Sequence, residues 1–89
     1  MSFYLSPKIV RKIMVNILNF FIEEEKTKFS YAEIIKICVY HDIFDKSAQK
    51  RIMQISQEMG ILINAGAFYE INIKLPEAIA LIQRLINEN

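Results

Sequence analysis

Hydrophobic and polar residues recur along this 89-residue chain with the periods of helices and strands. The first helical pattern begins at Ser6 and Pro7, because serine caps helix N-termini and proline suits the first helical position. Polar residues then follow at spacings of three and four, which places them on one narrow stripe of a helix. These residues are Lys8, Lys12, Asn16, Asn19 and Glu23. We therefore predict a helix over residues 7–25 that is apolar on most of its surface.

An apolar surface this wide has to be covered from more than one side. The core of the chain provides one cover. The other is either a second subunit or further elements of the same chain, in which case the helix is the centre of a monomeric core. We favour the second subunit and expect a homodimer. The expected interface residues are Val10, Met14, Ile17, Phe21, Ile82, Leu85 and Ile86.

Two shorter helices are predicted in the middle of the chain. Lys28 and Phe29 favour a short extended segment, and the S-x-x-E pattern of residues 30–33 is a capping box that starts a helix over 31–40. The following turn, residues 41–44, should carry buried apolar anchors. Asp45 can cap a helix over 46–59, which Gly60 ends in the left-handed conformation.

The last third of the chain predicts a hairpin and a final helix. Two β-prone runs within residues 61–73 are joined around Gly66, which supplies the positive φ of a tight connection. Pro76 opens a helix over 76–87, which should pack on the first helix within or between subunits. The whole chain, residues 1–89, is then one domain.

The helix over 46–59 has two contrasting faces. Its predicted apolar face holds Ala48, Ile52, Ile55 and Met59. Its opposite face holds Lys46, Lys50, Gln54 and Gln57, flanked by Ser47 and Met53. No acidic residue occurs between Lys46 and Gln57, so this face is polar and cationic.

Composition and charge change the picture in two respects. The hydrophobic fraction of 53% exceeds the roughly 45–50% of ordinary domains, which favours a partner that covers apolar surface. The net charge of +1 gives no global electrostatic case for binding nucleic acid, so the local cationic face carries that argument.

Little in the sequence points to catalysis, a cofactor or a membrane. Cys38 and His41 are each the sole residue of their type, and we expect Cys38 in the core. There is no nucleophile–base pair, no metal-ligand spacing and no glycine-rich phosphate loop, so we expect no enzyme, no metal and no cofactor. The longest apolar stretch, Ile9 to Ile22, is interrupted by polar residues and falls short of the roughly 20 needed to cross a bilayer. With no secretion signal at the N-terminus, we expect a cytoplasmic protein.

The predicted order of helix, short strand, helix, turn, helix, hairpin and helix resembles the winged-helix family of DNA-binding domains. The most specific stretch runs from Ser47 to Leu62. It is similar to the recognition helix of that family, with a polar start, a basic middle and an apolar-Gly-apolar-apolar exit into the wing. The resemblance implies an α+β, mainly α fold: a winged helix-turn-helix with a three-helix core, a two-stranded wing and an extra C-terminal helix. The chain is similar to small free-standing transcription regulators of archaea, their viruses and plasmids.

The resemblance also implies which residues meet DNA. The helix over 46–59 would enter the major groove, which admits one α-helix. Its expected base-contacting residues are Ser47, Gln49, Lys50 and Gln54. The expected phosphate contacts are Lys46, Arg51, Lys8 and Lys12, although Arg51 alternatively packs its stem on the apolar face. The wing departs from the family pattern because residues 64–70 contain no basic residue, and Asn64 is its only expected contact.

Two functions follow as hypotheses. We favour a regulator of transcription that binds double-stranded DNA as a homodimer. The alternative is a winged-helix adaptor that binds a protein partner and no DNA, which the near-neutral charge and the excess apolar surface favour. Duplex binding at low salt discriminates between the two.

Overall fold

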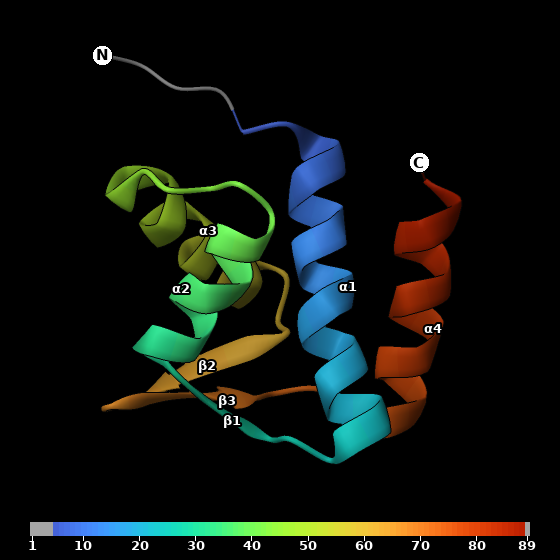
Figure 1. The fold of residues 1–89 in the computed structure, drawn as a ribbon. Coiled ribbons are helices and arrows are strands. Elements are labelled where there is room, and N and C mark those ends of the chain that lie inside the picture. The colour runs from blue at the N-terminus through green and yellow to red at the C-terminus, as the bar shows by residue number, and fades with distance from the viewer. Residues whose placement is uncertain (1–4, 89) are drawn as a thin grey trace.

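The computed structural model describes residues 5–88 and shows a small, mainly helical α+β protein (Figure 1). Residues 1–4 and 89 of the predicted domain lie outside the described residues. The described elements are α1 (Pro7–Glu24), β1 (Lys28–Ser30), α2 (Tyr31–Tyr40), α3 (Lys46–Glu58), β2 (Leu62–Ala65), β3 (Phe68–Ile71) and α4 (Leu75–Asn87). The predicted order of elements is confirmed, and the ends of the helices differ by no more than one residue.

The predicted helix caps are present as hydrogen bonds. The Ser6 hydroxyl accepts the N–H of Lys8 at 3.2 Å, and the Asp45 carboxylate accepts the N–H of Ala48 at 3.0 Å. Ser30 and Glu33 form the complete capping box, since each side chain accepts the backbone N–H of the other. These contacts are local in sequence, which explains why the pattern alone located the helix starts.

The sheet joins the middle of the chain to its last third. All strands are antiparallel in the order β1-β3-β2, with Phe29 of β1 and Asn64 of β2 both opposite Tyr69 of β3. Gly66 has φ +81° in the hairpin, and Gly60 has φ +76° after α3, as predicted for both glycines. The short junction at Gly60 therefore leads α3 directly into the hairpin.

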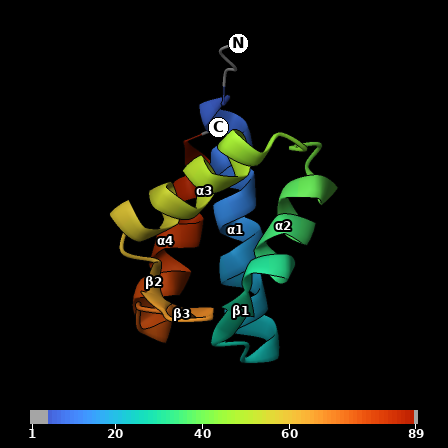
Figure 2. The same ribbon diagram turned by 90° about the vertical axis from the view of Figure 1, so that its left-hand side faces the viewer.

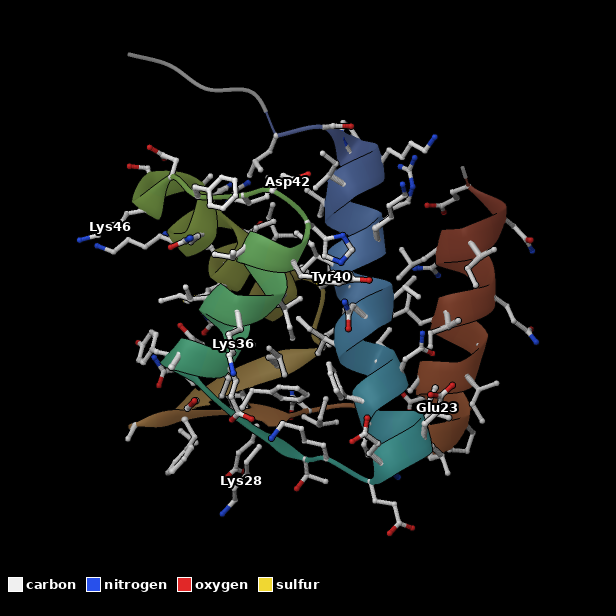
Figure 3. All side chains as sticks on the ribbon, viewed as in Figure 1. Glu23, Lys28, Lys36, Tyr40, Asp42 and Lys46 are labelled. Atoms are coloured by element: carbon white, nitrogen blue, oxygen red, sulfur yellow. The ribbon has the colours of Figure 1, made fainter. Side chains whose placement is uncertain are left out.

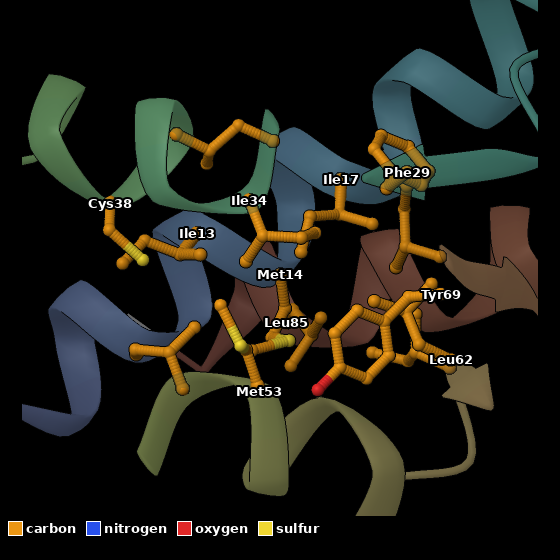
Figure 4. Packing of buried hydrophobic residues seen from close by; sticks show 14 of the residues in the cluster. Ile13, Met14, Ile17, Phe29, Ile34, Cys38, Met53, Leu62, Tyr69 and Leu85 are labelled. Carbon is orange, nitrogen blue, oxygen red and sulfur yellow. The ribbon is translucent and has the colours of Figure 1, made fainter. Parts of the chain in front are cut away.

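Helix α4 runs antiparallel to α1 and packs closely against it (Figures 1 and 2). The core between the helices and the sheet receives side chains from every element, as Figure 4 shows for part of the cluster. Its buried aliphatic, sulfur-containing and aromatic residues include Ile13, Met14, Ile17, Leu18, Phe29, Ile34, Cys38, Ile52, Ile61, Leu62, Tyr69 and Leu85.

Part of the predicted dimer interface is wrong. Met14, Ile17 and Leu85 are buried inside this chain, so they have no surface left for a partner. The physical reason is that α4 covers the second apolar side of α1 in the same chain. Of the remaining predicted interface residues, Val10, Phe21 and Ile82 are partly buried against the core, and Ile86 is exposed.

Candidate nucleic-acid interface

Helix α3 presents a polar face to solvent at the outer surface of the protein. In Figure 2, α3 crosses the front of the molecule, the β2–β3 hairpin lies beneath its C-terminal end, and α1 and α4 lie behind it. We call five exposed polar residues of α3 the α3 face: Lys46, Ser47, Lys50, Gln54 and Gln57. Lys46 extends away from the first turn of the helix (Figure 3).

The buried side of α3 is rotated from the predicted apolar face. Ile55 is only half-buried and Met59 is exposed. Met53, which the pattern placed beside the polar face, is instead in the core. The residues of α3 that the fold buries are Ala48, Gln49, Ile52, Met53 and Ser56.

Gln49 cannot read DNA bases as predicted, because it belongs to this buried side. Its side chain is 7% exposed, and Nε2 donates to the carbonyl of Ile43 at 3.0 Å. Ser56 is also buried, and its hydroxyl donates to the carbonyl of Met53 at 2.7 Å. Burial of both polar groups is tolerated because each has an internal partner. Gln49 therefore ties α3 to the turn that precedes it.

Arg51 lies at the edge of the α3 face and already has protein partners. Its guanidinium forms an ion pair with Glu58 at 3.2 Å and donates to Gln54 Oε1 at 3.4 Å. It also borders an open hollow of about 600 Å³ between α3 and the adjacent ends of α1 and α4. The neighbouring Glu58 offsets the charge of Arg51. Lys46 and Lys50 take part in none of the ion pairs among the described residues, so these two lysines supply the positive charge of the α3 face.

The structure does not bring Lys12 together with the α3 face. Lys12 lines a different hollow, on the side of α1 that lies between α4 and the C-terminal end of α2, together with His41 and Ile86. Burial and then the positive charge of Lys12 lower the pKa of His41, whose Nε2 lies 3.1 Å from Asn16 Nδ2. Lys8 is exposed one helical turn earlier on the same stripe of α1.

The β2–β3 hairpin, which the resemblance predicts to be the wing, carries apolar rather than cationic surface. Asn64 is exposed, but its Oδ1 accepts the N–H of Gly66 at 3.1 Å and so supports the hairpin turn. Ile63 and Phe68 are also exposed on the strands. This hydrogen bond uses the side-chain oxygen of Asn64 and leaves its amide nitrogen as a donor at the hairpin tip.

Sequence reasoning missed an apolar surface on α2. Tyr31, Ile35 and Val39 are exposed at intervals of four residues and form what we call the α2 stripe. Tyr31 also packs edge-to-face on Tyr69, with ring centroids 5.2 Å apart. Phe44 in the next turn is 66% exposed, so its prediction as a buried anchor is wrong. The spacing of four, set against the buried Ile34, Ile37 and Cys38, was the signal that could have revealed the stripe.

Residues 5–88 give little sign of other chemistry. No cluster of three acidic, histidine or cysteine side chains within them could hold a metal ion. Burial raises the pKa of the Cys38 thiol to about 11, which disfavours the reactive thiolate. No helix in this part of the chain has the length and apolar character needed to cross a membrane.

Comparison with known proteins found no relative of this chain. No protein-family model matches the chain, and no curated protein and no solved structure matches it. The residues and their geometry are therefore the basis for assigning a function.

Proposed function

We propose that this protein is a winged-helix regulator of transcription that binds double-stranded DNA as a homodimer, with α3 in the major groove. The observation that carries the proposal is the α3 face, a solvent-exposed helix surface with two lysines, one serine and two glutamines, which Arg51 and its ion-pair partner Glu58 border. The antiparallel sheet supports the fold assignment, because β1 joins the hairpin that follows α3.

Each residue of the α3 face suits a particular contact. Lys50 can donate to guanine O6 and N7 or to a phosphate, and Gln54 can pair both amide atoms with an adenine edge. Lys46 lies in the first turn of α3, where a lysine suits a phosphate. Ser47 can bond to either base or backbone. The wing contributes the amide of Asn64 and no cation.

The small number of cations sets the expected salt dependence. Lys46 and Lys50 neutralise about two phosphates for each copy of α3, so log K should fall with log salt with a slope of about −2 per copy. A two-fold dimer doubles this slope and presents two helices to half-sites about 34 Å apart.

The proposal is tested by fluorescence anisotropy with a mixed-sequence duplex over a salt series. The Lys50→Ala, Gln54→Ala double variant should bind at least about tenfold more weakly than the wild type. A matched control is the Lys36→Ala, Gln83→Ala double variant, which removes the same exposed residue types from α2 and α4. The control should bind like the wild type. No binding by the wild type at low salt, or an equal loss in the control, would overturn the proposal.

A protein-binding adaptor is the second candidate, and the α2 stripe is the observation that favours it. Exposed aromatic and β-branched side chains on one helix face are typical of protein interfaces rather than of phosphate contacts. This function predicts that the wild type binds a stoichiometric protein partner. The Ile35→Glu variant should lose this binding, and the Lys50→Ala, Gln54→Ala variant should retain it. It also predicts that the wild type binds no duplex.

A further inference from the structure

One side of α1 is a polar stripe whose charge changes sign along the helix. The residues of this α1 stripe are Lys8, Lys12, Asn16, Asn19 and Glu23. Both lysines and Glu23 are exposed, and the two asparagines are half-buried. Shallow hollows follow the stripe from Lys12 to Glu24, with α4 on one side and α2 on the other (Figures 1 and 3).

Helix α4 adds an apolar stripe along the same side of the molecule. The α4 stripe consists of Leu75, Ile79, Ile82 and Ile86, at helical spacings of four, three and four. Ile79 is 43% and Ile86 52% exposed, whereas the neighbouring Ala78 and Leu85 are buried against the core. Ile86 lines the same hollow as Lys12 and Asn16, so the α4 stripe borders the α1 stripe. Helix α4 therefore has one apolar side in the core and a second one in solvent.

The charges of the α1 stripe select how a second copy can meet this side. Two α1 helices that face each other in parallel would oppose lysine to lysine and glutamate to glutamate. In the antiparallel arrangement the basic end of each helix meets the acidic end of the other. Lys8 lies eight residues before Asn16 and Glu23 lies seven residues after it, so a two-fold axis near Asn16 brings these two charges opposite each other.

The same two-fold axis also matches the apolar surface. An axis that lies between the copies and perpendicular to α1 reverses α1 but keeps α4 on the same side. The α4 stripe of one copy then meets the α4 stripe of the other. One two-fold rotation therefore pairs the opposite charges of the α1 stripes, brings their asparagines together and packs the apolar α4 stripes against each other.

We propose that a second copy of this chain docks on this side, with the two α1 helices antiparallel and the two α4 stripes packed together. The inference rests on the homodimer within the proposed function and is independent of DNA binding. It keeps Ile82 and Ile86 in the interface and replaces the buried Met14, Ile17 and Leu85 with the exposed α1 stripe.

The first test is the mass of the protein in solution, measured by sedimentation equilibrium without DNA from micromolar concentration upward. The wild type should be a dimer, and the Ile79→Glu, Ile86→Glu variant should raise the dimer dissociation constant at least about 30-fold. Ile35→Glu on α2 is the control, because Ile35 is 37% exposed on a helix outside this side. Circular dichroism checks that each variant keeps its helices. A monomeric wild type, or dissociation by Ile35→Glu alone, would overturn the inference.

Charge reversal tests the antiparallel arrangement. Lys8→Glu and Glu23→Lys should each weaken the dimer about tenfold, because symmetry repeats every lost ion pair. The double variant restores opposite charges and should return to within about threefold of the wild type. Failure of this restoration would exclude the antiparallel pairing. A monomer that still binds duplex overturns this inference and the homodimer but leaves DNA binding by α3 standing, whereas a dimer that binds no duplex overturns the DNA-binding proposal alone.

Discussion

Gln49 and Lys50 are adjacent in α3, yet their side chains meet different surroundings. A helix turns about 100° per residue, and this turn is enough to direct Gln49 into the core and Lys50 into solvent. Gln49 then supplies the hydrogen-bond donor for the carbonyl of Ile43, on the turn that positions α3. Gln49, which we predicted to contact a base, instead anchors α3, the helix that carries the remaining candidate base-contacting residues.

Replacing Gln49 should therefore affect stability. Gln49→Ala removes the donor for a part-buried carbonyl, and we expect the free energy of unfolding to fall by about 1–3 kcal/mol. Gln54→Ala, on the exposed side of the same helix, should change it by no more than about 0.5 kcal/mol. Urea denaturation of the two variants measures the difference. Equal effects would mean that the Gln49 hydrogen bond contributes nothing to the fold.

At the scale of elements, the start of α2 combines a cap with an ion pair. Glu33 accepts the N–H of Ser30 and pairs with Lys26 at 2.6 Å. The hydrogen bond from Lys26, followed by that from the Ser30 backbone, lowers the pKa of the Glu33 carboxyl below its ordinary value of 4.5. One carboxylate thus links the loop after α1, the end of β1 and the first turn of α2.

This arrangement predicts a pH-dependent contribution to stability. Because the pKa of Glu33 is lower in the folded protein, its contribution is present above about pH 4.5 and is lost as the pH falls through the lowered pKa. We expect Glu33→Gln to destabilise the protein at neutral pH and to have a smaller effect at a pH below the folded pKa. Thermal unfolding of both proteins over this pH range checks the sign. A difference that grows toward acid would contradict it.

The elements and their caps were predictable because their signals are local. Ser6, Ser30 and Asp45 bond to backbone groups two or three residues away, and Gly60 and Gly66 adopt the φ that glycine favours. The direction of burial on α3 was harder to predict, since Met53 and Ile55 pack against distant elements and Gln49 bonds to the carbonyl of Ile43 in the preceding turn. The exposure of Phe44 likewise depends on how the turn sits against the rest of the fold.

At the scale of the whole molecule, the sequence pattern allowed two ways of covering the apolar surface of α1. A partner subunit and a helix of the same chain satisfy the same apolar pattern, so periodicity cannot separate them. The structure shows α4 as the cover and places Leu85 in the core. It leaves exposed the α4 stripe, which our dimer proposal uses.

The role of α4 within the monomer core can be measured. Leu85→Ala should lower the free energy of unfolding by about 2–5 kcal/mol, because the truncated side chain leaves a cavity between α1 and α4. Gln83→Ala, exposed on the same helix, should leave it within about 0.5 kcal/mol. Chemical denaturation at a fixed protein concentration compares the two. A small effect of Leu85→Ala would mean that α4 is only loosely attached.

The pairing of early elements with late ones has a consequence for biosynthesis. Helix α1 needs α4 as its cover, and β1 needs β3 to enter the sheet. Contacts between such distant segments form only after both have left the ribosome, and they carry the loop-closure cost of the intervening chain. The emerging polypeptide thus exposes the apolar sides of α1 until α4 is made.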